Sequence, residues 1–337
     1  MMELFGKNTD KDVLVVAEIG MNHGGSLPWI KQFLVQLKDT GIDAVKFQLF
    51  TPEFFVAFNN EERFSQVSKV RLSERDFLEI NTFCRNLKIP VFATPVSHDW
   101  VDFIDVNCGV IKVASGDFTF DPISLRAIET KSKVILSTGA TSREEILHFI
   151  SKAKAIRGER DLKNTVALMH CISNYPPKIE HGNLMAIQDI QKITGLTVGF
   201  SSHFTSDEPI YAALGLGARI FEIHVTDDRG RQDSRDHALS RTPEQIREIT
   251  SNLRSLNLSM RDSEKIVQKS ELDIQDQIRK GFIYSEKFEA GHLLKMEDIT
   301  YARPRNPEFS NLSQIIGKSL GVSVGKYEAV SLKHFQK

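Results

Sequence analysis

Short apolar stretches alternate along the chain with longer segments of helical periodicity, and this alternation is the dominant pattern of the sequence. Apolar runs of this length, bounded by turn residues, indicate buried strands. The segments between them, such as SLPWIKQFLVQLKDTG and SREEILHFISKAKAIRG, place a Ser at the N-cap position and a Gly after the last turn, as helices do. The eight strand-like stretches are VLVVAEIG from 13, DAVKFQLF from 43, PVFATP from 90, VIKVAS from 110, KVILST from 133, TVALMHC from 165, LTVGFSS from 196 and RIFEIHV from 219.

Eight strand–helix units predict a closed (β/α)8 TIM barrel over residues 1–258. A doubly wound open sheet is the structural alternative, but no GxGxxG follows the first strand to support it. Residues 259–278 are polar and are expected to form a linker. From residue 279 to 337 the apolar stretches are short and broken by Gly, which predicts a small β-rich domain.

The second strand, DAVKFQLF, carries Lys46 and Gln48 inside an otherwise apolar run. Residues two apart on a strand point to the same face, and an ammonium and an amide are costly to bury without partners. We therefore expect this face to open into the barrel mouth. There Lys46 can pair with a bound anion or with Glu18 on the adjacent strand, and the two pairings are compatible.

Polar residues also occur at the carboxyl ends of all eight predicted strands. In a (β/α)8 barrel the active site lies at this end. Each one alone can be a hydrogen-bonded core residue; together they predict a site. Lys46 and Lys112 with several hydroxyls favour a small substrate with a phosphate and a carboxylate. His203 and His224 end consecutive strands and can hold a divalent metal. The residues are Glu18, Lys46, Gln48, Thr94, Lys112, Ser115, Ser137, Thr138, His170, Ser201, His203, Glu222 and His224.

Charge and composition exclude several classes of protein. The 337 residues carry 43 Lys and Arg against 44 Asp and Glu, a formal net charge of -1, which gives no indication of nucleic acid or an anionic membrane as a partner. No apolar run is long enough to span a bilayer, and the first residues lack the apolar core of a signal peptide. The three cysteines are scattered, so we expect reduced thiols and a cytoplasmic protein, with Cys171 as a small buried residue.

These polar residues lie in segments that resemble, in order, the signature segments of the sialic acid synthase family. This family includes the N-acetylneuraminate, legionaminate and pseudaminate synthases and the spore-coat polysaccharide synthase-like proteins. The C-terminal segments RKGFIY, FEAGHLLKMEDI, YARP and IIGKSL resemble the small antifreeze-like domain of that family. The barrel segments are AEIGMNHGG, VKFQLF, FATP, IKVASGD, ILSTGA, LMHCISNYPP, GFSSH, FEIHVTDD and DHALS.

The resemblance implies a barrel with an antifreeze-like domain, assembled as a domain-swapped homodimer in surface polysaccharide biosynthesis. The implied reaction joins phosphoenolpyruvate to the aldehyde of an N-acylated hexosamine, such as N-acetylmannosamine. It releases phosphate and gives a nine-carbon 2-keto sugar acid. His203 and His224 would hold Mn2+, with Mg2+ or Co2+ as alternatives.

The resemblance also implies roles for individual residues. Lys46 and Thr94 would hold the phosphoenolpyruvate carboxylate, and Glu18 and Asp236 would be the catalytic carboxylates near the sugar. Arg303 of the partner's small domain would reach the acyl group. The phosphate would lie among Lys112, Ser115, Ser137, Asn174 and Ser201, and the sugar would face Glu18, Gln48, Asp117, Tyr175 and Asp236.

Three departures from the family pattern fall where sugar specificity would be set. They are GRQDSRDH before the DH segment, the long loop after the second strand, and PRNPEF after Arg303. They leave the identity of the sugar open. Two rival functions also remain: a metal-dependent aldolase or sugar-phosphate phosphoenolpyruvate synthase on the same barrel, and a non-catalytic carbohydrate-binding protein.

Overall fold

The computed structural model describes residues 2–260, 264–305 and 307–335. The chain divides into two compact units, Met1–Arg261 and Asp262–Lys337, and each is described by itself. Part of the predicted linker, residues 261–263, lies outside the described residues. The remainder carries two short helices, α12 (Lys269–Leu272) and α13 (Gln275–Ile278).

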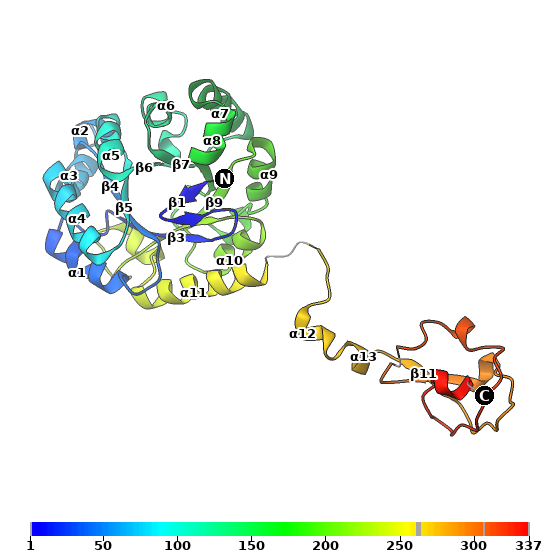
Figure 1. The fold of residues 1–337 in the computed structure, drawn as a ribbon. Coiled ribbons are helices and arrows are strands. Elements are labelled where there is room, and N and C mark those ends of the chain that lie inside the picture. Colours follow the sequence, from blue (N-terminus) through cyan, green and yellow to red (C-terminus); the bar gives the residue numbers. More distant parts are fainter. Residues whose placement is uncertain (1, 261–263, 306, 336–337) are drawn as a thin grey trace. The chain divides into compact units, whose positions relative to one another are not determined.

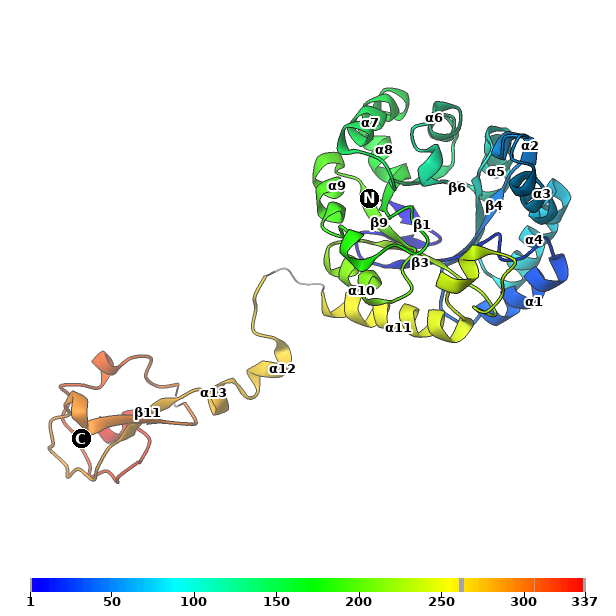
Figure 2. The ribbon, with the colours of Figure 1, turned by 180° about the vertical axis from the view of Figure 1, so that it is seen from behind.

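The first unit is a closed barrel of eight parallel strands in the order β10-β3-β4-β5-β6-β7-β8-β9 (Figures 1 and 2). Each strand coincides with one of the eight predicted stretches, so the barrel is confirmed and the open sheet is excluded. The strands are β3 (Leu14–Gly20), β4 (Ala44–Leu49), β5 (Val91–Pro95), β6 (Val110–Val113), β7 (Lys133–Ser137), β8 (Val166–His170), β9 (Thr197–Ser202) and β10 (Ile220–His224).

Helices cover the outside of the barrel, and side-chain caps fix where several of them begin. Ser26, Ser73, Ser142 and Thr242 each accept a hydrogen bond from a backbone N–H in the first turn of the helix that follows. The covering helices are α1 (Leu27–Leu37), α4 (Glu74–Leu87), α5 (Val101–Cys108), α6 (Asp121–Glu129), α7 (Arg143–Arg157), α8 (Glu159–Thr165), α9 (Ala186–Thr194), α10 (Glu208–Gly215) and α11 (Pro243–Ser259). The loop after β4 adds α2 (Pro52–Phe55) and α3 (Glu61–Val70).

Strand alternation separates an apolar shell from a barrel interior that becomes polar toward one end. On β4, Val45, Phe47 and Leu49 belong to the core between strands and helices, whereas Ala44 belongs to the apolar layer inside the barrel. Lys46 and Gln48 have the same parity as Ala44 and come later in the strand. The interior is therefore apolar at the amino ends of the strands and polar at their carboxyl ends.

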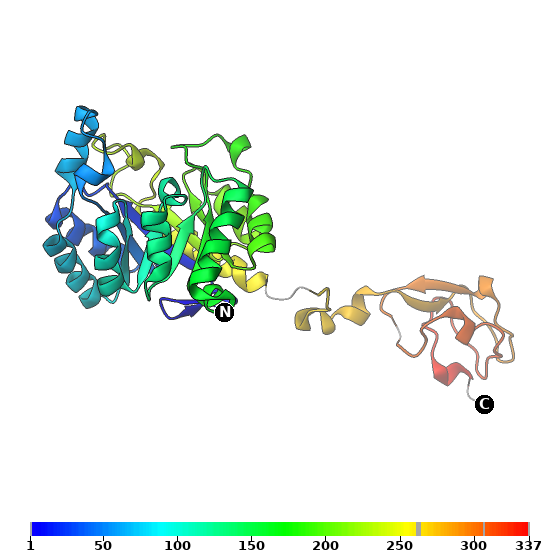
Figure 3. The same cartoon turned by 90° about the horizontal axis from the view of Figure 1, so that it is seen from above.

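A short N-terminal hairpin closes the apolar end of the barrel, and the sequence analysis did not predict it. Its strands are β1 (Glu3–Leu4) and β2 (Lys7–Asn8), and Figure 3 shows it at the end opposite α2 and α3. Met2 and Leu4 are buried in the interior layer, and the Phe5 ring lies 5.4 Å from that of Phe92. Access to the interior is therefore from the carboxyl ends of the strands.

The second unit has one two-stranded antiparallel sheet among its described residues, β11 (Gly281–Tyr284) with β12 (Ile299–Ala302). Isolated bridges such as Phe288 with Val324 join its loops. Its own small core centres on Tyr284, whose hydroxyl lies 3.0 Å from His334 Nδ1. In the described part of the chain, no helix is both long and apolar enough to cross a membrane.

Candidate active site

A cavity of about 310 Å3 lies at the carboxyl ends of the barrel strands. Most of its walls come from strand ends, and the loops after β6, β8, β9 and β10 supply the rest. Both buried lysines and both histidines singled out in the sequence reach it. Its lining is Glu18, Lys46, Gln48, Thr94, Lys112, Ala114, Ser115, Gly116, Ser137, Cys171, Ser173, Tyr175, Ser201, His203, Glu222, His224 and Arg235.

Lys46 lies at the centre of a buried network of charges on one side of the cavity. Its Nζ is 2.7 Å from Glu18 Oε2 and donates to Thr94 Oγ1 at 2.9 Å. Glu222 Oε1 is 3.7 Å away. The strand register explains the closest pair, because Glu18 on β3 stands directly opposite Lys46 on β4. The predicted pairing of Lys46 with Glu18 is thus present.

Lys112 occupies the far side of the same network. Its Nζ donates to Ser137 Oγ at 2.5 Å and lies 3.8 Å from Glu222 Oε2. Ser201 donates to the other oxygen of Glu222 at 3.2 Å. Glu222 thus stands between Lys46 and Lys112, and its negative charge offsets the repulsion between the two buried ammonium groups.

In this arrangement the pKa values of the two buried carboxyls, Glu18 and Glu222, shift in opposite directions. Burial raises the pKa of Glu18, although Lys46 acts in the other direction. Burial also acts to raise the pKa of Glu222, but Lys112 and Lys46 outweigh it and lower that pKa to about 2. Glu222 is therefore a fixed anion, and Glu18 is the carboxyl better suited to accept and return a proton. Burial lowers the pKa of Lys112, and the negative charge of a bound anion would in turn favour its protonated form.

His203 and His224 converge on the other side of the cavity, with ring centroids 5.4 Å apart. His203 Nδ1 lies 2.7 Å from the Ile172 carbonyl oxygen, which assigns its proton to Nδ1 and leaves Nε2 as a lone-pair donor. Burial and the neighbouring His224 lower the pKa of His203 to about 4, so its ring is neutral at neutral pH. His224 Nδ1 is buried with no hydrogen-bond partner and lies 3.9 Å from Asp236 Oδ2.

These observations test whether the donor set fits a divalent cation. Two imidazoles that converge with unused nitrogens, and a buried carboxylate beside them, form a borderline N/O set that suits a first-row metal. Asp236 Oδ1 also lacks a hydrogen-bond partner. Among the described residues no group of three or more His, Cys, Asp or Glu side chains is already drawn together as a metal cluster. The site therefore fits a cation that completes its coordination with substrate or water.

A third group of side chains packs around Gly139, in the loop after β7. The Gly139 N–H donates to Ser115 Oγ at 3.1 Å, and Ser115 Oγ lies 3.1 Å from Cys171 Sγ. Burial raises the pKa of Cys171, which keeps it a thiol and agrees with its interpretation as a small buried residue. A Cβ on Gly139 would lie 2.8 Å from both Ser115 Oγ and Cys171 Sγ and would overlap Ser173 Oγ. This wall closes only because position 139 has no side chain.

We expect Gly139→Ala to lower kcat/KM about a hundredfold, because the added methyl group displaces the hydroxyls of this wall. Overpacking should also lower the free energy of unfolding by about 1–3 kcal/mol. Gly116→Ala is the matched control, since Gly116 lines the same cavity and a Cβ there meets nothing within 4 Å. Phosphate release and thermal melts measure both effects. Equal behaviour of the two variants would contradict the packing argument.

The structure brings most of the predicted site residues together and leaves four elsewhere. Asp117 and Asn174 do not line the cavity, and Asn174 is exposed with its Oδ1 accepting from the Tyr175 N–H. Asp236 is buried behind the lining, beside His224. Arg303 belongs to the second unit, where its Nε donates to the Ile278 carbonyl. The predicted residues that line the cavity are Glu18, Lys46, Gln48, Thr94, Lys112, Ser115, Ser137, Tyr175, Ser201, His203 and His224.

Burial also perturbs Asp117, raising its pKa to about 6, with Lys112 acting in the opposite direction. Two charged residues of the lining, Glu222 and Arg235, were not among the site residues predicted from the sequence. Glu222 was noted as a strand-end residue, but its position between two lysines on other strands depends on barrel closure. Arg235 lies in a loop without periodicity; its Cζ is 4.8 Å from the centroid of the Tyr175 ring, which itself lies 4.0 Å from the His203 ring.

The chain is similar to several known proteins. A model of the NeuB family matches residues 34–265. An uncharacterized protein of Methanocaldococcus jannaschii is 32% identical over 91% of this chain and 89% of its own length. N,N'-diacetyllegionaminic acid synthase of Legionella pneumophila is 27% identical over 96% of this chain and 94% of its own. The crystal structure of N-acetylneuraminic acid synthetase from Leptospira borgpetersenii, in complex with citrate, superposes with a TM-score of 0.72 at 27% identity, covering 78% of this chain and 90% of that one.

Proposed function

The chain belongs to the NeuB family, and we propose that it condenses phosphoenolpyruvate with the open-chain aldehyde of an N-acylated hexosamine to form a nine-carbon 2-keto sugar acid. It is an enzyme of the sialic acid synthase type, a transferase. The observation that carries the proposal is the meeting, in one cavity, of two buried lysines with a pair of converging histidines. This arrangement would suit a small multiply charged anion beside a carbonyl group that a cation held by the histidines would polarise.

The lysines divide the anion between them. Lys46 and Thr94 would bind the carboxylate of phosphoenolpyruvate. Their polar atoms lie 2.9 Å apart, so one carboxylate could contact both. Lys112 and Ser137, joined at 2.5 Å, would take the phosphate together with Ser115 and Ser201. Asn174, exposed beside Tyr175 in this structure, would reach the phosphate only by turning inward. Holding both ends of the anion aims its enol carbon at the aldehyde.

Glu18 is the residue we propose for proton transfer. Carbon–carbon bond formation leaves an oxocarbenium-like centre at the phosphate-bearing carbon, and water must add there before phosphate departs. Burial raises the pKa of Glu18, and Gln48 Nε2 donates to its Oε1 at 3.1 Å, which orients the carboxyl. Glu18 can therefore accept a proton from the attacking water. Gln48 and Tyr175 would face the sugar directly, and Asp236 and Asp117, which do not line the cavity, would contribute from behind its walls.

His203, His224 and Asp236 are the residues that would hold the divalent cation, which we propose to be Mn2+, with Mg2+ or Co2+ as alternatives. A bound cation would polarise the sugar aldehyde as a Lewis acid. Within the protein, the bond between His203 Nδ1 and the Ile172 carbonyl orients that ring toward the cavity. The second unit would be an antifreeze-like domain, with Arg303 contacting the acyl group across a domain-swapped homodimer in the cytoplasm.

The test is phosphate release from phosphoenolpyruvate by the full chain. Release should require phosphoenolpyruvate, a divalent cation and an acylated hexosamine together, and omission of any one should abolish it. Mass spectrometry should identify the nine-carbon acid. If folded protein released no phosphate with any acylated hexosamine, or used pyruvate without releasing phosphate, the proposal would be wrong.

A further inference from the structure

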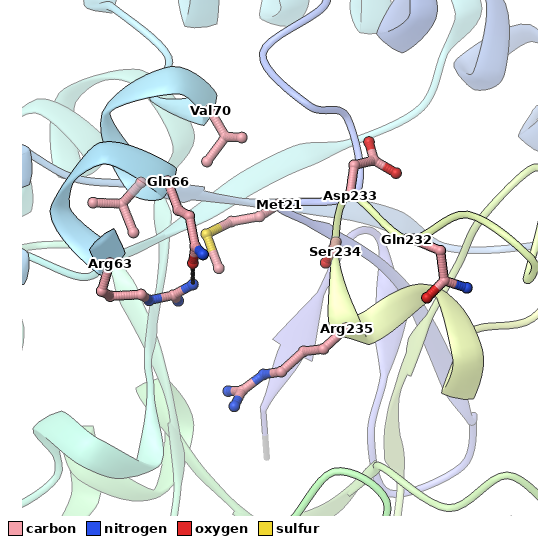
Figure 4. Close-up of a pocket in the computed structure, with 9 residues that line it drawn as sticks. Met21, Arg63, Gln66, Val70, Gln232, Asp233, Ser234 and Arg235 are labelled. Atoms are coloured by element: carbon pink, nitrogen blue, oxygen red, sulfur yellow. Dashed lines mark hydrogen bonds between the residues drawn. The ribbon is translucent and has the colours of Figure 1, made fainter. Parts of the chain in front are cut away.

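A second cavity of about 320 Å3 lies next to the catalytic one, and the two share Arg235. We call it the outer pocket, and Figure 4 shows its two walls. One wall is α3, with Arg63 and Gln66, and the other is the segment 232–235 before α11. Met21, in the loop after β3, lies between them. Its lining is Met21, Arg63, Gln66, Val67, Val70, Gln232, Asp233, Ser234 and Arg235.

The wall formed by α3 is held against the barrel by a close backbone contact. A Cβ on Gly25 would lie 2.6 Å from the Lys69 carbonyl oxygen, so only glycine lets α3 approach the loop after β3 this closely. Gly25 also has a φ of +79°, which a residue with a side chain rarely adopts. At the other end of the helix, Asn60 caps α3 by accepting from the Arg63 N–H at 3.2 Å. These contacts fix where the Arg63 side chain begins.

The opposite wall is fixed by a network of ion pairs. Arg231 Nη2 lies 2.5 Å from Asp233 Oδ2, and Arg231 Nε donates to Asp233 Oδ1 at 3.1 Å. Arg231 also lies over the Trp29 ring, with Cζ 5.2 Å from its centroid. Both oxygens of Asp233 are therefore engaged, although this residue lines the pocket. Segment 232–235 is held in position before any ligand arrives.

The arginines that face the outer pocket, Arg63 and Arg235, have weaker contacts with carboxylates than Arg231 has. Within the described residues Arg63 has no carboxylate partner, and its Nη1 makes only a long bond of 3.4 Å to Gln66 Oε1. Arg235 projects into the space between the walls, with its Nε 3.7 Å from Asp236 Oδ1 and its side chain 71% exposed. Two guanidinium groups thus present unused N–H donors, in the fork geometry that suits carboxylate or phosphate.

We infer that the outer pocket binds an anionic group on the end of the acceptor sugar remote from its aldehyde, and that Arg63 determines this specificity. The inference rests on the proposed function, which places the aldehyde beside His203 and His224. The acceptor would then extend past Tyr175 and Arg235 toward α3. The anionic group can be a phosphate monoester or a carboxylate, because both accept bidentate hydrogen bonds from arginine.

Three acceptors of one scaffold test the inference: N-acetylmannosamine, its 6-phosphate, and N-acetylmannosaminuronic acid. We expect at least one charged acceptor to exceed the neutral one about tenfold in kcat/KM. Arg63→Gln should remove most of that advantage through KM and leave kcat unchanged, since Arg63 is remote from the reacting atoms. The charged acceptor that loses its advantage identifies phosphate or carboxylate as the ligand.

Arg71→Gln is the matched control, because Arg71 follows the same helix, is exposed and does not line the pocket. It should leave the preference unchanged. A neutral acceptor used as well as both charged ones, or an unchanged preference in Arg63→Gln, would overturn the inference. If phosphoenolpyruvate releases no phosphate with any of the three acceptors, the proposed function fails instead. Titration calorimetry of the 6-phosphate and the uronic acid with wild type and Arg63→Gln then decides the inference alone, since equal affinities would refute it.

Discussion

Replacing Lys46 with Met should abolish turnover and destabilise the barrel at the same time. The side chain neutralises Glu18 at 2.7 Å and lies 3.7 Å from Glu222, and all three groups are buried. Without it, two carboxyls share a closed site with Lys112 as the only remaining lysine of the network. Removing one partner of a buried ion pair costs about 3–5 kcal/mol. Loss of the anion contact should lower kcat/KM on the order of a thousandfold.

A second substitution separates the two effects. In Lys46→Met combined with Glu18→Gln, one positive and one negative charge are lost together, so the network of Lys112 and Glu222 is again balanced. We expect chemical denaturation to show most of the lost stability restored. Activity should stay absent, because neither the anion contact nor the proton-transfer group is present. Recovery of phosphate release in the double variant would refute the roles proposed for both residues.

The barrel was predictable because the same local pattern, a short apolar stretch that ends in polar residues, occurs eight times. Each apolar stretch becomes a strand within one or two residues at either end. On β4 the parity of Lys46 and Gln48 alone placed them inside the barrel, and the pairing of Lys46 with Glu18 followed from neighbouring strands in register. Such inferences need only local periodicity and the order of the strands.

Other features depend on contacts that local periodicity does not encode. The hairpin β1–β2 has strands of two residues each, too short to give a pattern, yet Met2 and Leu4 close the barrel. Glu222 meets Lys112 across the interior, although β10 and β6 are not neighbours in the sheet. The stacking of Arg235 on Tyr175 joins two irregular loops, whose paths are set by tertiary packing.

Replacing His224 with Ala should remove turnover while leaving the barrel nearly as stable as before. His224 Nδ1 is buried without a hydrogen-bond partner, so truncation breaks no bond within the protein at that atom. If the ring holds a divalent cation, its loss should weaken Mn2+ binding and lower kcat/KM on the order of a thousandfold. Calorimetric titration with Mn2+ and phosphate-release kinetics measure the two effects independently.

His170→Ala, at the end of β8, should show the opposite effects on stability and on metal binding. His170 is also buried, but its Nε2 lies 2.9 Å from the Gly182 carbonyl oxygen and the ring does not line the catalytic cavity. Its truncation should lower the melting temperature because it leaves a cavity and an unpaired carbonyl, while Mn2+ affinity stays near that of the wild type. Retained Mn2+ binding and turnover in His224→Ala would exclude His224 as a metal ligand. A binding defect of similar size in both variants would instead show that the loss comes from a general disturbance of the strand ends, since only His224 faces the cavity.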